Sequence, residues 1–109
     1  MITAEFFRFG KAQGSALSGF SVQGHAGYAL AGEDIVCAAV SSAVELTANG
    51  ITEILKADAE AEVLDNQIRL RLRRAEPAAD VFLRALRLQL ELIAGEYPGC
   101  IQVICPEKG

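Results

Sequence analysis

The chain has 109 residues, of which 51% are apolar, and its formal net charge at pH 7 is −4. This length suits one domain with a core of its own, so we expect a single domain over residues 1–109. The acidic balance argues against direct nucleic-acid binding, because such domains usually carry a basic excess. No apolar run approaches the roughly 20 residues that cross a bilayer. The N-terminal segment has an early acidic residue, Glu5, and no basic segment that leads into an apolar stretch, so it does not resemble a targeting peptide, and we expect a cytoplasmic protein without membrane contact.

The first elements in chain order are two strands and a glycine-rich loop. Residues 2–9 are rich in aromatic and β-branched side chains, and residues 17–22 form a second run of this kind after a glycine-containing turn. This pattern predicts an antiparallel pair of strands. The loop over residues 24–33 contains His25, the only histidine of the chain, and several glycines, whose tolerance of positive φ permits tight turns or the close approach of another backbone.

The first predicted helix begins at Asp34. Small and apolar residues without strand alternation predict a helix over residues 34–49, which could continue through residues 51–55 after a kink. Asp34 is expected to be the N-cap, which places Cys37 near the start of the helix. There the helix dipole and the unpaired N–H groups favour a thiolate over a thiol. Ser41 follows Cys37 by one turn and shares its helix face.

A charged hairpin is the clearest strand signal in the chain. Apolar and polar residues alternate on both sides of a two-residue turn at 65–66, in the register that sets Glu62 opposite Arg69 and Glu60 opposite Arg71. The arginines could indicate RNA binding. Because glutamates lie opposite them, we interpret this surface instead as a solvated sheet face with paired charges.

The second predicted helix has more apolar surface than one sheet face can cover. Pro77 suits its first turn, helical periodicity extends over residues 80–94, and Gly95 is expected to end it. Beside the apolar stripe that would face a sheet, a second stripe consists of Val81, Ala85, Leu88 and Leu92. A sheet face needs a stripe only about 100° wide, so the second stripe requires another partner, either the first helix or a second subunit.

A final strand over residues 100–105 completes the order ββαββαβ. These elements predict an α+β domain with two helices packed on a largely antiparallel mixed sheet. Cys100 and Cys105 point to opposite faces of the last strand, so they cannot bond to each other. The three cysteines include no Cys-x-x-Cys pair, and one histidine cannot complete a zinc set without carboxylates, so we expect reduced thiols, no metal site and no other cofactor.

Cys37 and His25 are the candidates for chemistry. A glycine-rich loop with the only histidine leads directly into the helix of Cys37, which we interpret as the active site of a cysteine protease. Two structural alternatives stay open at this point: a buried cysteine that acts as a small apolar residue, and a loop histidine bonded to the backbone. The residues alone do not decide between them. Asp34 could cap the helix, orient the histidine, or do both.

The motif resembles that of a known protease family. The sequence Gly-His-Ala at 24–26 and the sequence Asp-Ile-Val-Cys-Ala-Ala-Val-Ser at 34–41 are similar to the signature of the ribosomal-processing cysteine proteases called Prp. Members of that family remove a short N-terminal extension from the large-subunit ribosomal protein numbered twenty-seven, and they cut after an aromatic pair. The resemblance therefore implies a cysteine endopeptidase of ribosome maturation whose partner is the N-terminal peptide of that ribosomal protein.

The resemblance also implies roles for individual residues. Cys37 corresponds to the nucleophile and His25 to the general base and acid. The supporting or substrate-binding residues would be Gly24, Asp34 and Ser41. A homodimer is implied as well, which agrees with the second apolar stripe of the second predicted helix.

The alternative function is a non-catalytic module that assists ribosome assembly or binds a ribosomal protein, with Cys37 merely buried. A redox thiol protein is a third possibility, but it is weakened because no resolving cysteine lies near Cys37 in the sequence. The reactivity of the Cys37 thiol distinguishes the enzyme from the binding module.

Overall fold

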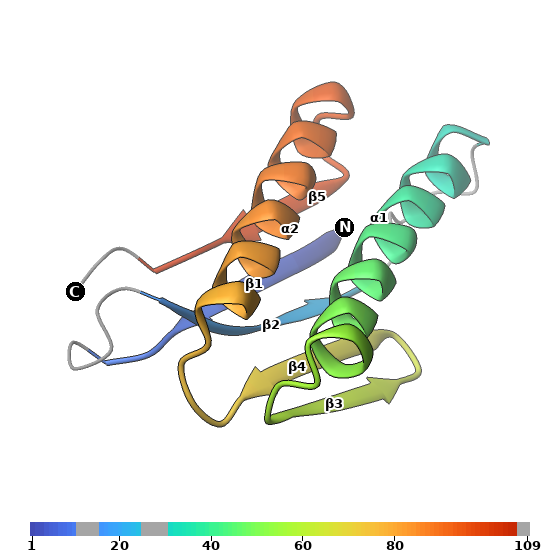
Figure 1. Cartoon of the computed structure of the whole chain (residues 1–109). Coiled ribbons are helices and arrows are strands. Elements are labelled where there is room, and N and C mark those ends of the chain that lie inside the picture. Colours follow the sequence, from blue (N-terminus) through green and yellow to red (C-terminus); the bar gives the residue numbers. More distant parts are fainter. Residues whose placement is uncertain (11–15, 25–30, 107–109) are drawn as a thin grey trace.

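The computed structural model describes residues 1–10, 16–24 and 31–106, and for residues 31–34 it describes the backbone alone. Its elements are, in chain order, β1 (Ile2–Arg8), β2 (Leu17–Gln23), α1 (Ala31–Asn49), the π-helical turn η2 (Gly50–Ile54), β3 (Ala59–Leu64), β4 (Gln67–Leu72), α2 (Pro77–Glu96) and β5 (Ile101–Ile104). With η2 counted as the end of the first helix, the predicted order ββαββαβ is confirmed (Figure 1).

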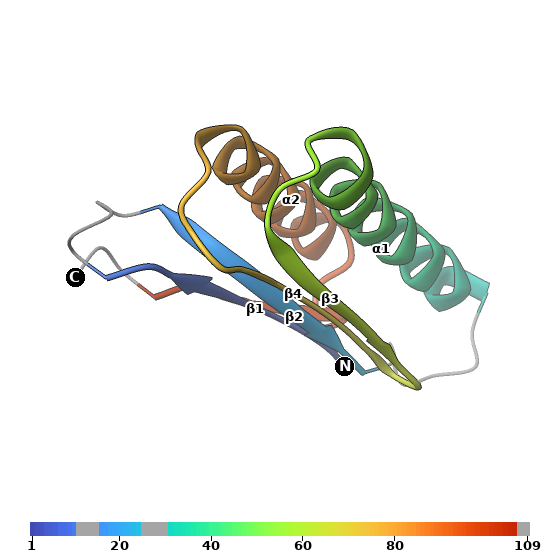
Figure 2. The ribbon, with the colours of Figure 1, turned by 60° about the horizontal axis from the view of Figure 1, so that its bottom comes forward.

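The strands form one five-stranded sheet with the order β3-β4-β2-β1-β5. β5 runs parallel to β1, and the other neighbouring pairs are antiparallel. Both helices lie side by side on the same face of the sheet (Figure 2). The predicted α+β architecture, with two helices on a largely antiparallel mixed sheet, is therefore confirmed.

The hairpin of β3 and β4 has the predicted register. Glu62 lies opposite Arg69, and Glu60 lies opposite Arg71, around the two-residue turn at 65–66. Successive side chains of a strand point to opposite faces, so a shift of β4 by one residue would move the buried Leu70 and Leu72 to the solvent. Burial of these two residues thus selects the same register as the charges do.

The core lies between the sheet and the two helices. Phe6 and Phe20 come from the neighbouring strands β1 and β2, while Val36, Leu70 and Leu83 come from α1, β4 and α2; none of the five is more than 1% exposed. Burial of this apolar layer is the main favourable term that holds the helices on the sheet. It also fixes the position of the residues on the flanks of α1.

The first helix begins earlier than predicted. α1 begins at Ala31, so the prediction that Asp34 is its N-cap is wrong. Alanine and glutamate, at positions 31 and 33, are good helix formers, which lets the helix extend through the intervening glycine. Cys37 is consequently the seventh residue of the helix, beyond the first four N–H groups that a helix leaves unpaired. The helix dipole therefore acts on Cys37 less strongly than the sequence predicted.

The predicted continuation beyond Asn49 is confirmed, in the form of a π-helical turn. The N–H of Leu55 donates to the carbonyl of Gly50 at 2.9 Å, which closes this turn. A Cβ atom at Gly50 would come within 2.6 Å of the ring of Phe82 on α2. Glycine at this position therefore allows the end of the first helix to approach the second closely.

The second helix begins at Pro77, as predicted, but it ends at Glu96 and includes Gly95. The chain reverses after the helix at Gly99, whose φ of 87° favours glycine. The helix thus ends one residue beyond the glycine that was expected to stop it, because a single glycine near a helix terminus can remain helical at modest cost.

The segment Ile35–Ile54 is long and apolar enough to cross a bilayer by length and composition. The sequence analysis found no such span because small polar residues interrupt its apolar runs. Val36, Val40 and Val44 of this segment are at most 4% exposed and belong to the core. We attribute the apolar character of this buried face to its packing on the sheet.

Candidate active site

Cys37 lies on the flank of α1 that faces the tip of the β3–β4 hairpin. Its side chain is partly buried and borders a hollow of about 240 Å³ between the helix and the hairpin. The helix wall of this hollow consists of Cys37, Val40, Ser41 and Val44. Because Val40 and Val44 also pack in the core, the wall that carries the thiol is rigidly anchored.

Gly24, the first residue after β2, lines the same hollow. Its φ is 98°, and a Cβ atom there would lie 2.5 Å from the carbonyl oxygen of Met1, so only glycine fits this position without strain. Its N–H donates to the carbonyl of Asn66 at 3.0 Å, which ties the end of β2 to the hairpin turn. The described backbone therefore brings the chain to the Cys37 hollow at the residue that precedes His25.

The structure brings together three of the five site residues that the sequence indicated. Ser41 lies on the same helix wall as Cys37 and is exposed, and Gly24 lies across the hollow from the helix as part of another segment. His25 lies outside the described residues. The side chain of Asp34 is also outside them, although its backbone belongs to the first turn of α1.

The sequence analysis assigned the hairpin no role in the site, yet its tip forms the wall opposite Cys37. This wall includes Val63, Leu64 and Ile68. Val63 is 77% exposed and Leu64 is 46% exposed. Two adjacent apolar residues at the tip of an otherwise charged hairpin were the signal in the sequence that this tip could bind apolar groups, although they do not reveal that it lies opposite Cys37. A wall of this composition suits the apolar side chains of a peptide.

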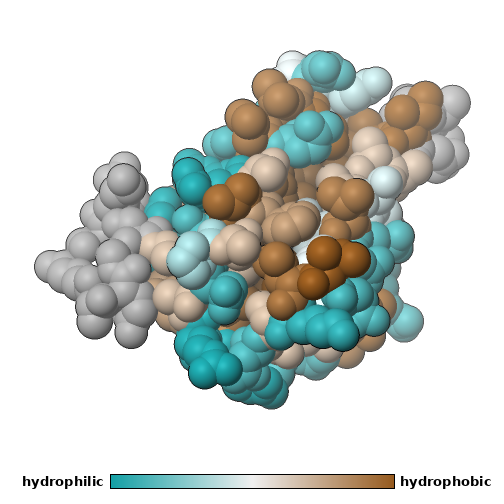
Figure 3. Space-filling view, viewed as in Figure 1, coloured by the Kyte–Doolittle hydropathy of each residue, from teal (hydrophilic) through white to brown (hydrophobic). Residues whose placement is uncertain are grey.

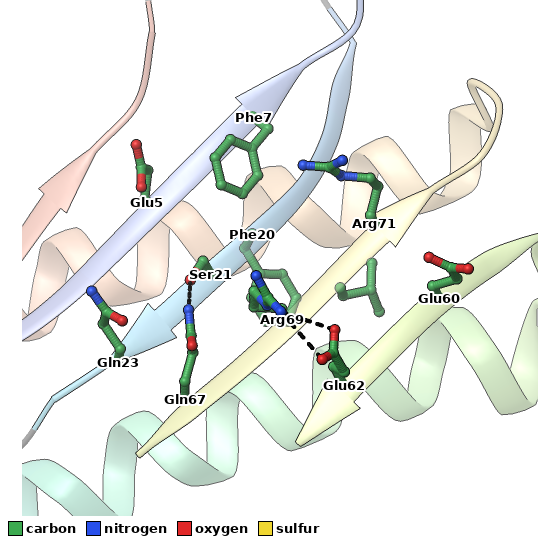
Figure 4. A pocket seen from close by; sticks show the side chains of 11 residues that line it. Glu5, Phe7, Phe20, Ser21, Gln23, Glu60, Glu62, Gln67, Arg69 and Arg71 are labelled. Atoms are coloured by element: carbon green, nitrogen blue, oxygen red, sulfur yellow. Dashed lines mark hydrogen bonds and ion pairs between the residues drawn. The ribbon is translucent and has the colours of Figure 1, made fainter. Parts of the chain in front are cut away.

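The outer face of the sheet, opposite the helices, holds a separate hollow of about 440 Å³ (Figure 4). Arg69 donates to both carboxylate oxygens of Glu62, at 3.0 and 3.2 Å. Beside this pair, Gln67 donates to the hydroxyl of Ser21 at 2.8 Å. Gln67 also borders the Cys37 hollow, whereas Glu62 and Arg69 line only the outer face, so we assign this ion pair no part in the chemistry of Cys37.

One predicted charge pair on this face is not formed. Glu60 lies opposite Arg71 in the register, but its carboxylate accepts a hydrogen bond from Arg73 at 2.9 Å. Arg71 lies over the ring of Phe7 instead, with its guanidinium carbon 5.8 Å from the ring centroid. Arg71 can reach Phe7 because Gly19, which lies between them on β2, has no side chain to block their contact.

Arg73 is the best-connected arginine of the hairpin. It donates to Asp58 at 2.6 Å and to Glu60 at 2.9 Å. These hydrogen bonds, first that to Asp58, raise the pKa of Arg73 above its ordinary value. Paired charges thus cover much of the outer face, as the sequence predicted, and its arginines do not form a purely basic surface for phosphates.

The two other cysteines lie away from the hollow. Cys100 is buried, and the sulfur of Cys105 lies 3.6 Å from a guanidinium nitrogen of Arg8. All three cysteines are free. Within the part of the chain that the structure describes, no three His, Cys, Asp or Glu side chains are placed to hold a metal ion.

A family model described as "Cysteine protease Prp" matches residues 1–102 of this chain. The chain belongs to the Prp family of cysteine proteases. The resemblance inferred from residues 24–26 and 34–41 is thereby confirmed. Comparison with curated proteins gives no match.

Solved structures, two of them of a Prp protease, share the fold. The essential ribosomal processing protease Prp from S. aureus, in complex with a substrate peptide, is 21% identical over 97% of this chain and 100% of its own, with a TM-score of 0.84. The same protease with a covalently linked product peptide is 22% identical, with the same coverage and TM-score. The protein SMU.848 from Streptococcus mutans is 24% identical over 96% of this chain and 93% of its own, with a TM-score of 0.75. These likenesses show the common fold.

The Prp fold presents Cys37 in a setting that suits a protease nucleophile. A cysteine protease needs a thiol that an extended peptide can reach, held on an element that does not move. Cys37 meets both conditions because it borders a hollow and lies on a helix anchored in the core. Cys100 is only 8% exposed, so it does not meet the first condition.

Proposed function

We propose that this chain is a cysteine endopeptidase that removes the N-terminal extension of the large-subunit ribosomal protein numbered twenty-seven during ribosome maturation in the cytoplasm. The main support for the proposal is that Cys37, Gly24 and Ser41 line one hollow. These residues come from both halves of the sequence motif, residues 24–26 and residues 34–41. Membership of the Prp family supports the chemistry. The complex of the S. aureus ribosomal processing protease with a substrate peptide supports the kind of partner.

In the proposed reaction, the Cys37 thiolate attacks the scissile carbonyl to form a tetrahedral intermediate and then an acyl-enzyme. His25 donates a proton to the leaving amine and later activates the water that releases the acyl group. Gly24 contributes through the backbone, since its φ sets the direction in which the chain leaves β2 toward His25. Ser41 presents its hydroxyl to the peptide on the wall that carries Cys37, and Asp34 supports the pair.

The hollow provides a place for apolar residues next to the scissile bond. Val40 and Val44 form its helix side, and Val63 and Ile68 form its hairpin side. Burial of apolar surface yields about 25 cal/mol per Å², so a large aromatic side chain gains more from these walls than a small one. Cleavage after an aromatic pair agrees with this composition.

The active form is proposed to be a homodimer that associates through the helices. Val81, Leu88 and Leu92 of the second apolar stripe are 56%, 58% and 55% exposed. Ala85 of the same stripe lines a groove of about 510 Å³ between α1 and α2. Figure 3 shows apolar side chains gathered over the helix layer. A second copy that covered this surface would remove from water the apolar area that a single chain leaves exposed.

The test is cleavage of a synthetic peptide that copies the N-terminal extension, followed by mass spectrometry. We expect the wild type to cut after the aromatic pair, and Cys37→Ser and His25→Ala to remain folded but inactive. Cys105→Ser is the matched control, because this cysteine lies outside the hollow and should retain activity. Full activity of either Cys37→Ser or His25→Ala would end the assignment.

Thiol labelling separates the enzyme from the non-catalytic module. With iodoacetamide at pH 7, the enzyme should show much faster alkylation of Cys37 than of Cys100 or Cys105. Equally slow labelling of all three thiols, together with peptide binding but no cleavage, would instead support a module that only binds a ribosomal protein.

A further inference from the structure

β3 is an edge strand of the sheet. One side of its backbone pairs with β4 from Ala59 to Leu64. Among the described strands, none pairs with its other side, which lies at the border of the sheet below α1 (Figure 1). A free edge of this kind offers a row of N–H and C=O groups that an extended peptide can join.

Every second residue of β3 turns its backbone groups toward this free edge. The carbonyl of Asp58, just before the strand, accepts a hydrogen bond from the N–H of Arg73 at 2.9 Å, so the backbone of Asp58 faces the β4 side. The N–H and C=O of one strand residue point to the same side, and successive residues alternate. The even-numbered residues of β3 therefore face β4. The residues that face the free edge are Ala59, Ala61 and Val63.

The same edge is continuous with the Cys37 hollow. Val63 lines the hollow and is 77% exposed. A peptide strand paired with β3 would place every second side chain on the helix face of the sheet, beside Ala61 and Val63 and in front of the thiol. The intervening side chains would lie on the outer face, beside Glu60 and Glu62.

We propose that the substrate peptide binds as an added strand along the free edge of β3, with its scissile carbonyl delivered to Cys37. This inference rests on the proposed function, because it takes Cys37 as the nucleophile. Hydrogen bonds to the backbone of Ala61 and Val63 hold the peptide extended whatever its sequence, while the apolar walls of the hollow select alternate side chains. An unstructured N-terminal extension is suited to this mode, because its backbone groups are free to pair.

The first test removes one backbone donor from the edge. Val63→Pro deletes an N–H that does not bond to β4, and proline is tolerated on an edge strand whose N–H faces solvent. Val63→Ala is the matched control, because it shortens the side chain but keeps the N–H. Both changes are made in the Cys37→Ser background, so that the binding of a fluorescent copy of the N-terminal extension is measured by anisotropy without cleavage.

We expect Val63→Pro to bind the peptide about tenfold more weakly than Val63→Ala does, the loss typical of one hydrogen bond whose partner is left unpaired. The two variants should have similar melting temperatures. Equal affinities of two folded variants would overturn the added-strand mode.

The second test changes only the peptide and keeps the Cys37→Ser protein, so it does not depend on the folding of a β3 variant. A series of peptides carries one backbone ester in place of one amide, which deletes a single N–H at each position in turn. We expect the affinity for Cys37→Ser to fall about tenfold at every second position and to stay constant between them. Losses without a two-residue period would show that the peptide crosses the hollow without pairing to β3. Failure of the wild type to cleave the all-amide peptide would refute the proposed function, whereas a two-residue period of affinity losses would still show that the peptide adds to β3 as a strand.

Discussion

Replacement of Gly24 by alanine tests whether the geometry at the end of β2 is required. Gly24 has a φ of 98°, and an added Cβ atom would lie 2.5 Å from the carbonyl oxygen of Met1. The left-handed backbone alone costs a residue with a side chain about 1–2 kcal/mol. Relief of the contact requires a backbone shift that weakens the hydrogen bond from Gly24 to Asn66, so we expect a total loss of about 2–3 kcal/mol.

The matched control is Gly95→Ala. Gly95 is helical, and no atom lies within 4 Å of the Cβ that alanine would add. Alanine should therefore stabilise α2 by about 0.5–1 kcal/mol. The two substitutions add the same methyl group and are expected to change the free energy of unfolding in opposite directions.

The assay is thermal unfolding followed by circular dichroism, with peptide cleavage measured at 20 °C, where both variants remain folded. A domain of this size should lose roughly 4 °C of melting temperature for each kcal/mol, so Gly24→Ala should melt about 10 °C below the wild type. Its cleavage rate should fall as well, because a shifted β2 end moves the chain that leads to His25. A Gly24→Ala variant with wild-type melting temperature and rate would refute this reasoning.

Three further outcomes follow from contacts in the core and on the helices. Leu70→Ala should lower the free energy of unfolding by about 2–5 kcal/mol because Leu70 is 1% exposed in the core, whereas Arg71→Ala on the outer face should lower it by less than about 1 kcal/mol. Similar losses for the two variants in urea unfolding would show that the faces of β4 are misassigned. Asp80→Ala should lower the free energy of unfolding by about 1–3 kcal/mol, because the Asp80 carboxylate accepts a hydrogen bond from the N–H of Leu17 at 2.8 Å. Unchanged stability by calorimetry would show that solvent replaces this hydrogen bond. Leu88→Asp should convert the proposed homodimer to a monomer, and a wild type that is already monomeric by light scattering at micromolar concentration would remove that proposal.

The elements and the hairpin register could be predicted because their causes are local. The two-residue turn at 65–66 and the match of Glu62 with Arg69 both depend on residues close together in the chain. The start of α1 was predicted wrongly because two starting points agree with the local sequence. Asp34 has the chemistry of an N-cap, but Ala31, three residues upstream, is a good helix former, and local signals do not decide between a start at one or the other.

The walls of the candidate site could be predicted only in part. The motif indicated Cys37, Gly24 and Ser41, which the structure places around one hollow. The opposite wall, with Val63, depends on how β4 pairs with β2 and so on the order of strands in the sheet. That pairing joins residues distant in sequence, and no local pattern specifies it. The roles of His25 and of the Asp34 side chain stay predictions.

The pairing of β5 with β1 has a consequence for how the chain folds. Ile2 pairs with Ile101, so this contact closes a loop of nearly the whole chain, and loop closure of this length carries a large entropic cost. We expect β5 to join the sheet last, after the contacts between β1, β2 and the hairpin have formed. During synthesis, β1 would remain an open edge until residues 101–104 have left the ribosome, and a chain that stalls before then would expose a template for aggregation.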